Sequence, residues 1–289
     1  MHFPLYDASL YYVPYGNCRY GFNGCAPGYI PWYRPYGYAT SYGAGSMYGG
    51  VRAPQPEHKD GPERVGERQP HADHVDWASQ FPREVILHGP SVKEVALTFD
   101  DGPDDHWTPR VLDALRDAGV KATFFCVGQR VQANPEVFRR ILREGHIVGN
   151  HSWNHANLAR IPLNEATDQI VRTNDEMHRV ADVRPHLLRP PYGALSEPLI
   201  REATRLGMII ILWNVDSLDW TQIPAEQVAV NMLAHTGPGA IILQHSAGGE
   251  GQSLQNTVDA LPRVISTLRN RGYAFRSVPE LLKIPAYNK

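Results

Sequence analysis

A glycine joint occurs four times after residue 80 and constrains the fold more than any other feature. At Gly119, Gly145, Gly207 and Gly272 an amphipathic run ends, and a short apolar run begins after the glycine. Such a joint is typical of a helix that ends in a left-handed glycine and leads into a strand. The repeated order of helix and strand predicts parallel strands with helices outside them.

Prolines beside small polar residues mark helix starts. Thr108-Pro109, Asn134-Pro135 and Ser196 ahead of Pro198 each combine an N-cap with a first-turn proline.

About seven strand–helix units fit into residues 81–289. This stretch is somewhat shorter than the roughly 250 residues that are typical of a complete eight-unit barrel. The sequence therefore predicts an α/β fold, a distorted or incomplete (β/α) barrel of about seven strands. An open doubly wound sheet is the alternative. Further strands are expected at 187–188 and 240–243, and long helices at 164–180 and 253–271.

The sequence before this domain has a different composition. Residues 1–50 hold 11 of the 14 tyrosines, with many glycines and prolines and no helical or strand periodicity. They are predicted to form a disordered Tyr/Gly/Pro-rich tail. The sharper hypothesis is an adhesive tail that associates with a coat or wall layer. Residues 51–80 are charged and Pro-rich and are interpreted as a linker.

Composition argues against several classes of protein. A formal net charge of -2 and a pI near 6.7 disfavour a nucleic-acid partner. No apolar run reaches the roughly 18 residues of a membrane span, and no signal peptide is visible at the N-terminus. Cys18, Cys25 and Cys126 form no disulfide framework and no zinc motif. Cys126 lies in an apolar run and is expected to be a buried small hydrophobe.

Polar residues follow the predicted strands at the points where those strands end. In parallel α/β folds the carboxyl ends of the strands meet at one face, and active sites are built there. The residues expected at this face are Asp100 and Asp101, His151 and His155, Arg189, Asp216 and Asp219, and His245.

Two histidines and one carboxylate in this set predict a metal site. His151 and His155 are four residues apart, so on one helical turn both imidazoles would face the same way. With Asp101 they make a hydrolytic zinc set that leaves a position open for water. Asp100 would be the base that takes a proton from that water. The alternatives are a polar turn at Asp100-Asp101 and two unrelated surface or core histidines.

The remaining polar and aromatic residues fit supporting tasks. Arg189 would hold Asp100 in place and keep it ionised, unless it forms a surface salt bridge. His245 suits a general acid that a neighbouring Asp219 tunes; the alternatives are a core histidine and a helix cap. Tyr192 and Trp220 offer flat surfaces for sugar rings, or are core aromatics.

The ordered motifs resemble those of one known family. Over about residues 90–282 the chain is similar to the polysaccharide deacetylases, carbohydrate esterase family 4. The motifs are Thr98-Phe-Asp-Asp-Gly102, His151-Ser-x-x-His155, Arg189-x-Pro-Tyr192, Asp216-x-x-Asp-Trp220 and Leu243-x-His245. The resemblance implies that Asp100 is the base, that Asp101, His151 and His155 bind the metal, and that Arg189 orients Asp100. It further implies an oxyanion contact from the backbone N–H of Tyr192, a catalytic acid His245 tuned by Asp219, and a groove wall at Trp220.

The resemblance also implies a function. It predicts a bacterial, metal-dependent hydrolase that removes N-acetyl groups from GlcNAc-containing polysaccharide, peptidoglycan or chitin oligomers, and releases acetate. The metal is expected to be zinc, with cobalt, nickel or manganese as alternatives. Many family members are secreted, so the cell envelope or spore surface is the suspected location, although no signal is visible. Two alternatives stay open: an acetylxylan O-deacetylase, and a coat or envelope structural protein with a carbohydrate-binding barrel.

Overall fold

The computed structural model describes Gln55 and residues 75–288. The predicted tail, Cys18 and Cys25 lie outside the described residues, as does most of the predicted linker. The strands are β1 (Val85–Ile86), β2 (Glu94–Asp100), β3 (Thr123–Cys126), β4 (Ile147–Asn150), β5 (Leu187–Leu188), β6 (Ile209–Ile211), β7 (Val215–Asp216), β8 (Ala240–His245) and β9 (Ala274–Phe275). The α-helices are α1 (Trp77–Gln80), α2 (Trp107–Ala118), α3 (Gly128–Ala133), α4 (Pro135–Arg143), α5 (Leu163–Ala181), α6 (Glu197–Arg205), α7 (Ala225–His235), α8 (Gln255–Asn270) and α9 (Val278–Leu282).

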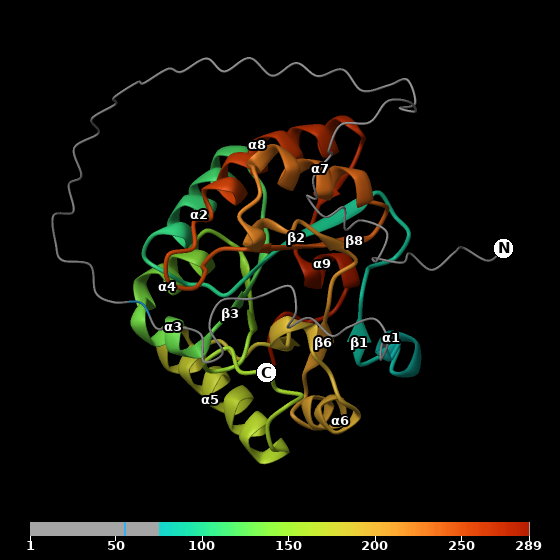
Figure 1. Ribbon diagram of the computed structural model, residues 1–289. Helices are drawn as coiled ribbons and strands as arrows, with labels where there is room; N and C mark the ends of the chain where they lie inside the picture. Colours follow the sequence, from blue (N-terminus) through green and yellow to red (C-terminus); the bar gives the residue numbers. More distant parts are fainter. Residues whose placement is uncertain (1–54, 56–74, 289) are drawn as a thin grey trace, which may run out of the picture. The chain divides into compact units, whose positions relative to one another are not determined.

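The strands form one curled parallel sheet that does not close. Their order is β1-β6-β5-β4-β3-β2-β8-β7, with β9 beside β2, and every pairing between these strands is parallel. The chain crosses the opening of the barrel between β6 and β7, which lie near opposite ends of this order. Helices α2, α4, α3 and α5 follow one another along the outside of the sheet (Figure 1). The predicted incomplete barrel is confirmed.

About seven strands were expected, and the described residues contain nine. The additional ones, β1 and β7, have two residues each. A strand of two residues is too short to show the alternation by which strands are recognised in a sequence. As a consequence, Asp216 ends β7 and Asp219 follows that strand. Neither residue belongs to the strand predicted at 208–213.

Alternation along β2 decides which side chains reach the inside of the barrel. Leu97 and Phe99 pack into the large cluster between the sheet and its outer helices. Ala96 belongs instead to the apolar cluster that includes Phe125 and Ile241. Because side chains on a strand alternate between its two faces, Thr98 and Asp100 share the face of Ala96. The strand therefore directs the Asp100 carboxylate into the barrel.

The predicted helix ends are confirmed, and one predicted start is wrong. Gly119, Gly145, Gly207 and Gly272 all have positive φ angles, between 61° and 84°. The Ser196 hydroxyl accepts a hydrogen bond from the backbone N–H of Leu199, as an N-cap does. Helix α2, however, starts at Trp107 and not after Thr108. The carboxylate of Asp104 accepts from the backbone N–H groups of Trp107 and Thr108 (2.6 and 2.8 Å), and so takes the capping role.

A short helix lies directly before residue 81. Helix α1 lies at the end of the predicted linker, and its Trp77 and Ala78 pack on a core cluster with Phe81. Cys126 is completely buried in the core, as expected, and burial raises the pKa of its thiol. Among the helices in the described part of the chain, none combines the length and apolarity that a membrane crossing requires.

Candidate active site

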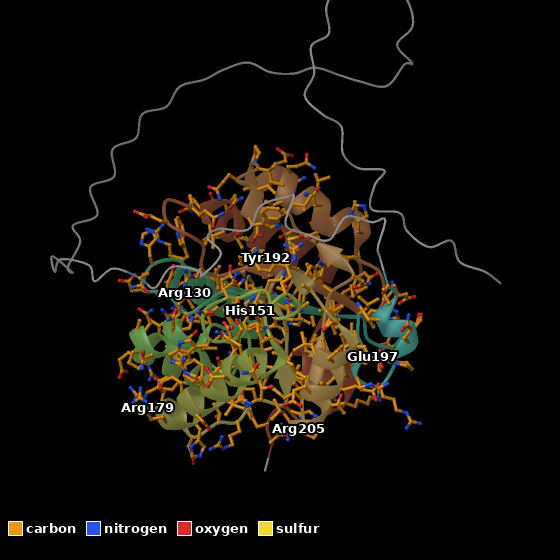
Figure 2. All side chains as sticks on the ribbon, turned by 60° about the horizontal axis from the view of Figure 1, so that its bottom comes forward. Arg130, His151, Arg179, Tyr192, Glu197 and Arg205 are labelled. Carbon is orange, nitrogen blue, oxygen red and sulfur yellow. The ribbon has the colours of Figure 1, made fainter. Side chains whose placement is uncertain are left out.

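The structure brings the predicted polar residues together at the carboxyl ends of the strands. Asp100 ends β2, His245 ends β8, and His151 and Arg189 directly follow β4 and β5. Figure 2 shows His151 and Tyr192 in the interior, away from peripheral side chains such as Arg179. These residues are at most 3% exposed: Asp100, Asp101, His151, His155, Arg189, Asp219 and His245.

Asp101, His151 and His155 converge on one point. The Oδ1 atom of Asp101 lies 3.3 Å from Nε2 of His151 and 3.3 Å from Nε2 of His155. One ligand atom from each residue lies within 4.8 Å of the other two. A carboxylate and two imidazoles that lie close together through such atoms are a donor set that can hold a divalent metal. These three residues therefore fit the metal site that the sequence predicted.

The two histidines reach this arrangement from a loop. The expectation that they share a helical turn is wrong, because residues 151–157 contain no helix. Ser152 and His155 have φ angles of 65° and 63°, and the Ser152 hydroxyl accepts a hydrogen bond from the backbone N–H of His155. The imidazole rings still lie 5.1 Å apart between centroids.

Two side chains outside the sequence motifs hold this loop. The Gln169 side-chain oxygen, on α5, accepts from the backbone N–H groups of Trp153 and Asn154 (2.9 and 3.1 Å). The Asn150 side-chain oxygen accepts from the N–H of Ser152, and its amide donates to the Ile170 carbonyl. A buried glutamine on the apolar face of a helix was the available signal for Gln169.

Arg189 is completely buried and makes the predicted contact with Asp100. Its Nη1 donates to Oδ1 of Asp100 at 2.7 Å and to the Thr98 hydroxyl at 2.8 Å. Nε and Nη2 donate to the carbonyls of Ile211 and Leu212, and the guanidinium lies over the Phe125 ring at 4.1 Å. A side chain fixed at four points holds the Asp100 carboxylate in one position. The surface salt bridge that was the alternative for Arg189 is wrong.

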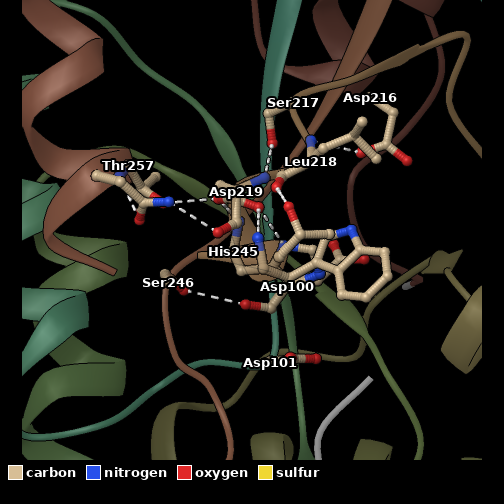
Figure 3. Close-up of polar contacts among 12 residues, drawn as sticks. Asp100, Asp101, Asp216, Ser217, Leu218, Asp219, His245, Ser246 and Thr257 are labelled. Atoms are coloured by element: carbon tan, nitrogen blue, oxygen red, sulfur yellow. Dashed lines mark hydrogen bonds and ion pairs between the residues drawn. The ribbon is translucent and has the colours of Figure 1, made fainter. Parts of the chain in front are cut away.

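Asp219 and His245 form a second buried pair (Figure 3). His245 Nδ1 lies 2.7 Å from Oδ1 of Asp219, and the backbone N–H of His245 donates to Oδ2. The Thr257 hydroxyl, in the first turn of α8, also donates to Oδ2 at 2.7 Å. Burial alone would raise the pKa of Asp219, but the charge of His245 and these hydrogen bonds outweigh burial and lower the pKa.

The two neighbouring carboxylates also affect the pKa of His151. Burial by itself lowers the pKa of His151, but the negative charges of Asp100 and Asp101 outweigh burial and raise the pKa above its ordinary value. The Nδ1 atom of His151 lies 2.6 Å from the carbonyl oxygen of Arg189. A hydrogen bond to that carbonyl would turn Nε2 toward Asp101 as the metal-binding nitrogen.

A second buried cation, Arg130, was also missed. Its Nη1 donates to the carbonyl of Asp101 (3.3 Å), and its Nη2 donates to the carbonyl of Gly248 (2.7 Å). It therefore ties the residues that follow β2 to the loop that follows His245. The signal in the sequence was a charged residue between Val127 and Val131, at the spacing of an apolar helix face.

Strained backbone is concentrated in these loops. Asp101, Ser152, His155 and Tyr192 are four of the eight non-glycine residues with positive φ in the described part of the chain. Each such residue costs about 1–3 kcal/mol and persists only where its surroundings fix it. At Asp101 the φ of 73° turns the chain sharply after β2, which separates the directions of Asp100 and Asp101.

The two predicted substrate-contacting aromatics are almost buried. Tyr192 is 8% exposed and lies in the short 3-10 helix η4 (Pro191–Gly193), and Trp220 is 6% exposed in η5 (Asp219–Thr221). Their small exposed portions leave little area for stacking on a sugar ring. Substrate contact by either side chain stays a prediction.

Comparisons with known proteins give the same picture as the motifs. The family model for polysaccharide deacetylases matches residues 88–211. A peptidoglycan-N-acetylglucosamine deacetylase of Bacillus cereus is 42% identical over 208 residues, which are 72% of this chain and 74% of that protein. A peptidoglycan-N-acetylmuramic acid deacetylase of Bacillus subtilis is 37% identical over 204 residues, 71% of this chain but 42% of that protein. A crystal structure of a peptidoglycan N-acetylglucosamine deacetylase, in complex with 4-naphthalen-1-yl-N-oxidanyl-benzamide, matches with a TM-score of 0.71 and 37% identity, and covers 74% of this chain and 100% of that one.

Proposed function

This chain belongs to the polysaccharide deacetylase family, and from that premise we propose that it removes N-acetyl groups from the N-acetylglucosamine units of peptidoglycan. Family membership makes it a metal-dependent hydrolase. Two of the similar proteins described above are named as peptidoglycan N-acetylglucosamine deacetylases, which supports N-acetylglucosamine as the unit acted on. Peptidoglycan as the substrate places the proposed site of action at the cell envelope.

One observation carries the proposed mechanism. Two buried pairs, Asp100 with Arg189 and His245 with Asp219, lie next to the Asp/His/His cluster, and each pair fixes one titratable group. Asp100 and His245 are register partners on the adjacent strands β2 and β8. A base and an acid held separately beside a metal site are what amide hydrolysis requires.

We assign the following roles to this chain's residues. Asp101, His151 and His155 would hold a divalent metal, zinc in the first place, which supplies polarisation of the acetamide carbonyl and activation of a water. Asp100 takes the proton as the water attacks the carbonyl carbon. The backbone N–H of Tyr192 donates to the developing oxyanion. His245 gives a proton to the departing nitrogen, so that acetate and a free amine leave.

Acetate release from N-acetylglucosamine oligomers and from peptidoglycan tests this function. The zinc-loaded protein should release acetate, and Asp100→Asn should lower kcat by about 10²–10⁴-fold. Asp105→Asn is the matched control, because Asp105 is an exposed carboxylate in the same loop, and it should behave as the unaltered protein does. Release from acetylxylan alone would assign O-deacetylation instead. An Asp100→Asn variant of full activity would contradict the assigned base.

A further inference from the structure

The imidazole of His155 has different neighbours at its two nitrogen atoms. Its Nε2 faces Asp101 in the metal cluster, whereas its Nδ1 lies 3.2 Å from the phenol oxygen of Tyr192. The Tyr192 ring also packs edge-on against the imidazole, with 4.8 Å between centroids. His155 is completely buried and Tyr192 is 8% exposed, so water competes little for this contact.

The nitrogen that binds a metal determines the proton on the other nitrogen. When Nε2 of a neutral imidazole binds a cation through its lone pair, Nδ1 carries the hydrogen and becomes a donor. For His151 the acceptor of that hydrogen is the carbonyl of Arg189, at 2.6 Å. For His155 the phenol oxygen of Tyr192 lies at the corresponding place.

We propose that the side chain of Tyr192 is a positioning residue for the metal site: its phenol oxygen accepts the Nδ1–H of His155 and fixes the ring with Nε2 toward the ion. This inference rests on the proposed metal-dependent function. It gives Tyr192 two separable tasks, since the proposed oxyanion contact uses its backbone N–H. An acceptor at this place fixes the tautomer and ring orientation of a metal-binding histidine and raises its basicity.

The backbone of η4 keeps the phenol at this place. Tyr192 has a φ of 63° between Pro191 and Gly193, and the N–H of Gly193 bonds back to the carbonyl of Pro190. Phenylalanine at position 192 retains this backbone and the edge-on ring contact, and removes only the hydroxyl. Tyr192→Phe therefore separates the phenol from the backbone N–H.

The first experiment measures the zinc dissociation constant of the full chain by competition with a chromogenic chelator, without glycan. Tyr192→Phe should weaken zinc binding about tenfold or more. Tyr287→Phe is the matched control, because Tyr287 is partly buried and its phenol oxygen accepts a hydrogen bond from the backbone N–H of Val148. It should leave zinc affinity within about twofold of the unaltered protein.

Three results would overturn the inference. The first is an unchanged zinc affinity in Tyr192→Phe. The second is an equal loss of zinc affinity in Tyr192→Phe and Tyr287→Phe, which would indicate a general effect of losing a phenol and not a specific hydrogen bond. The third is protonation of His155 at Nε2 rather than at Nδ1, measured by nitrogen NMR of the zinc-loaded unaltered protein with labelled histidines. This measurement does not depend on the folding of a variant. Because none of these measurements uses substrate, the outcome is independent of whether peptidoglycan is deacetylated.

Discussion

Thr257→Val tests whether the buried Asp219 is ionised and whether its hydrogen bonds stabilise the fold. Valine has nearly the shape of threonine but cannot donate the 2.7 Å hydrogen bond to Asp219. A hydrogen bond to a charged group contributes about 1.5–3 kcal/mol, and one between neutral groups about 0.5–1.5 kcal/mol. We therefore expect Thr257→Val to lower the free energy of unfolding at pH 7 by about 2 kcal/mol.

The loss should depend on pH in a defined direction. The pKa of Asp219 is lower in the folded protein than its usual value near 3.9. A carboxylate with a depressed folded-state pKa stabilises the fold above its unfolded pKa, and this stabilisation disappears as the pH falls through the folded-state pKa. The loss caused by Thr257→Val should therefore be constant from pH 7 down to about pH 5, and it should shrink only as the pH falls through the depressed folded-state pKa of Asp219.

Urea unfolding followed by circular dichroism between pH 3 and pH 7 measures this difference. Thr173→Val is the matched control: Thr173 is a buried helical threonine whose hydroxyl donates to the neutral carbonyl of Gln169. Its loss should be smaller, and the same at every pH. If Thr257→Val lowered the free energy of unfolding at pH 7 no more than Thr173→Val does, Thr257 would not be donating to an ionised carboxylate.

Two further predictions concern the metal and the loop that holds its histidines. Removing the metal with a chelator should abolish acetate release, and adding zinc should restore it; activity that survives complete metal removal would contradict the assigned role of the Asp/His/His cluster. In Gly128→Ala the new methyl group would lie 2.5 Å from the Trp153 ring and 2.7 Å from the Thr173 hydroxyl. The crowding should lower the free energy of unfolding by about 1–3 kcal/mol in urea titrations, and a loss below about 0.5 kcal/mol would show that the neighbours move aside easily.

The sequence predicted the composition of the site better than the path of the chain through it. Asp100, His151, Arg189 and His245 were placed together because they end strands or follow them directly, and parallel strands bring such positions to one face. The His151–His155 turn was predicted as helical because spacing alone does not distinguish a helix from a loop. The side chain of Gln169 bonds to Trp153 and Asn154 in this loop, but it lies 16 and 15 residues away along the sequence and reaches them only in the folded chain.

Contacts that depend on tertiary structure were missed for the same reason. Arg130 is a charged residue in an otherwise apolar pattern, and it donates to the backbone carbonyls of Asp101 and Gly248. Because every residue has a carbonyl group, no pattern of side chains could indicate these two hydrogen bonds. Strands β1 and β7 were missed because two residues show no alternation, and these strands are defined only by pairing with their neighbours.

The pairing of β2 with β8 has a consequence for how such a protein can diversify. Asp100 and His245 stand opposite each other in an unbroken six-residue register between these strands. Their separation is set by the sheet's hydrogen-bond ladder, about 4.8 Å between strands, and not by a loop. Loops around the opening of the barrel can thus be lengthened, shortened or exchanged, by natural drift or by grafting, with little effect on the spacing of acid and base. A single-residue insertion within β8, by contrast, would turn His245 to the other face of the sheet.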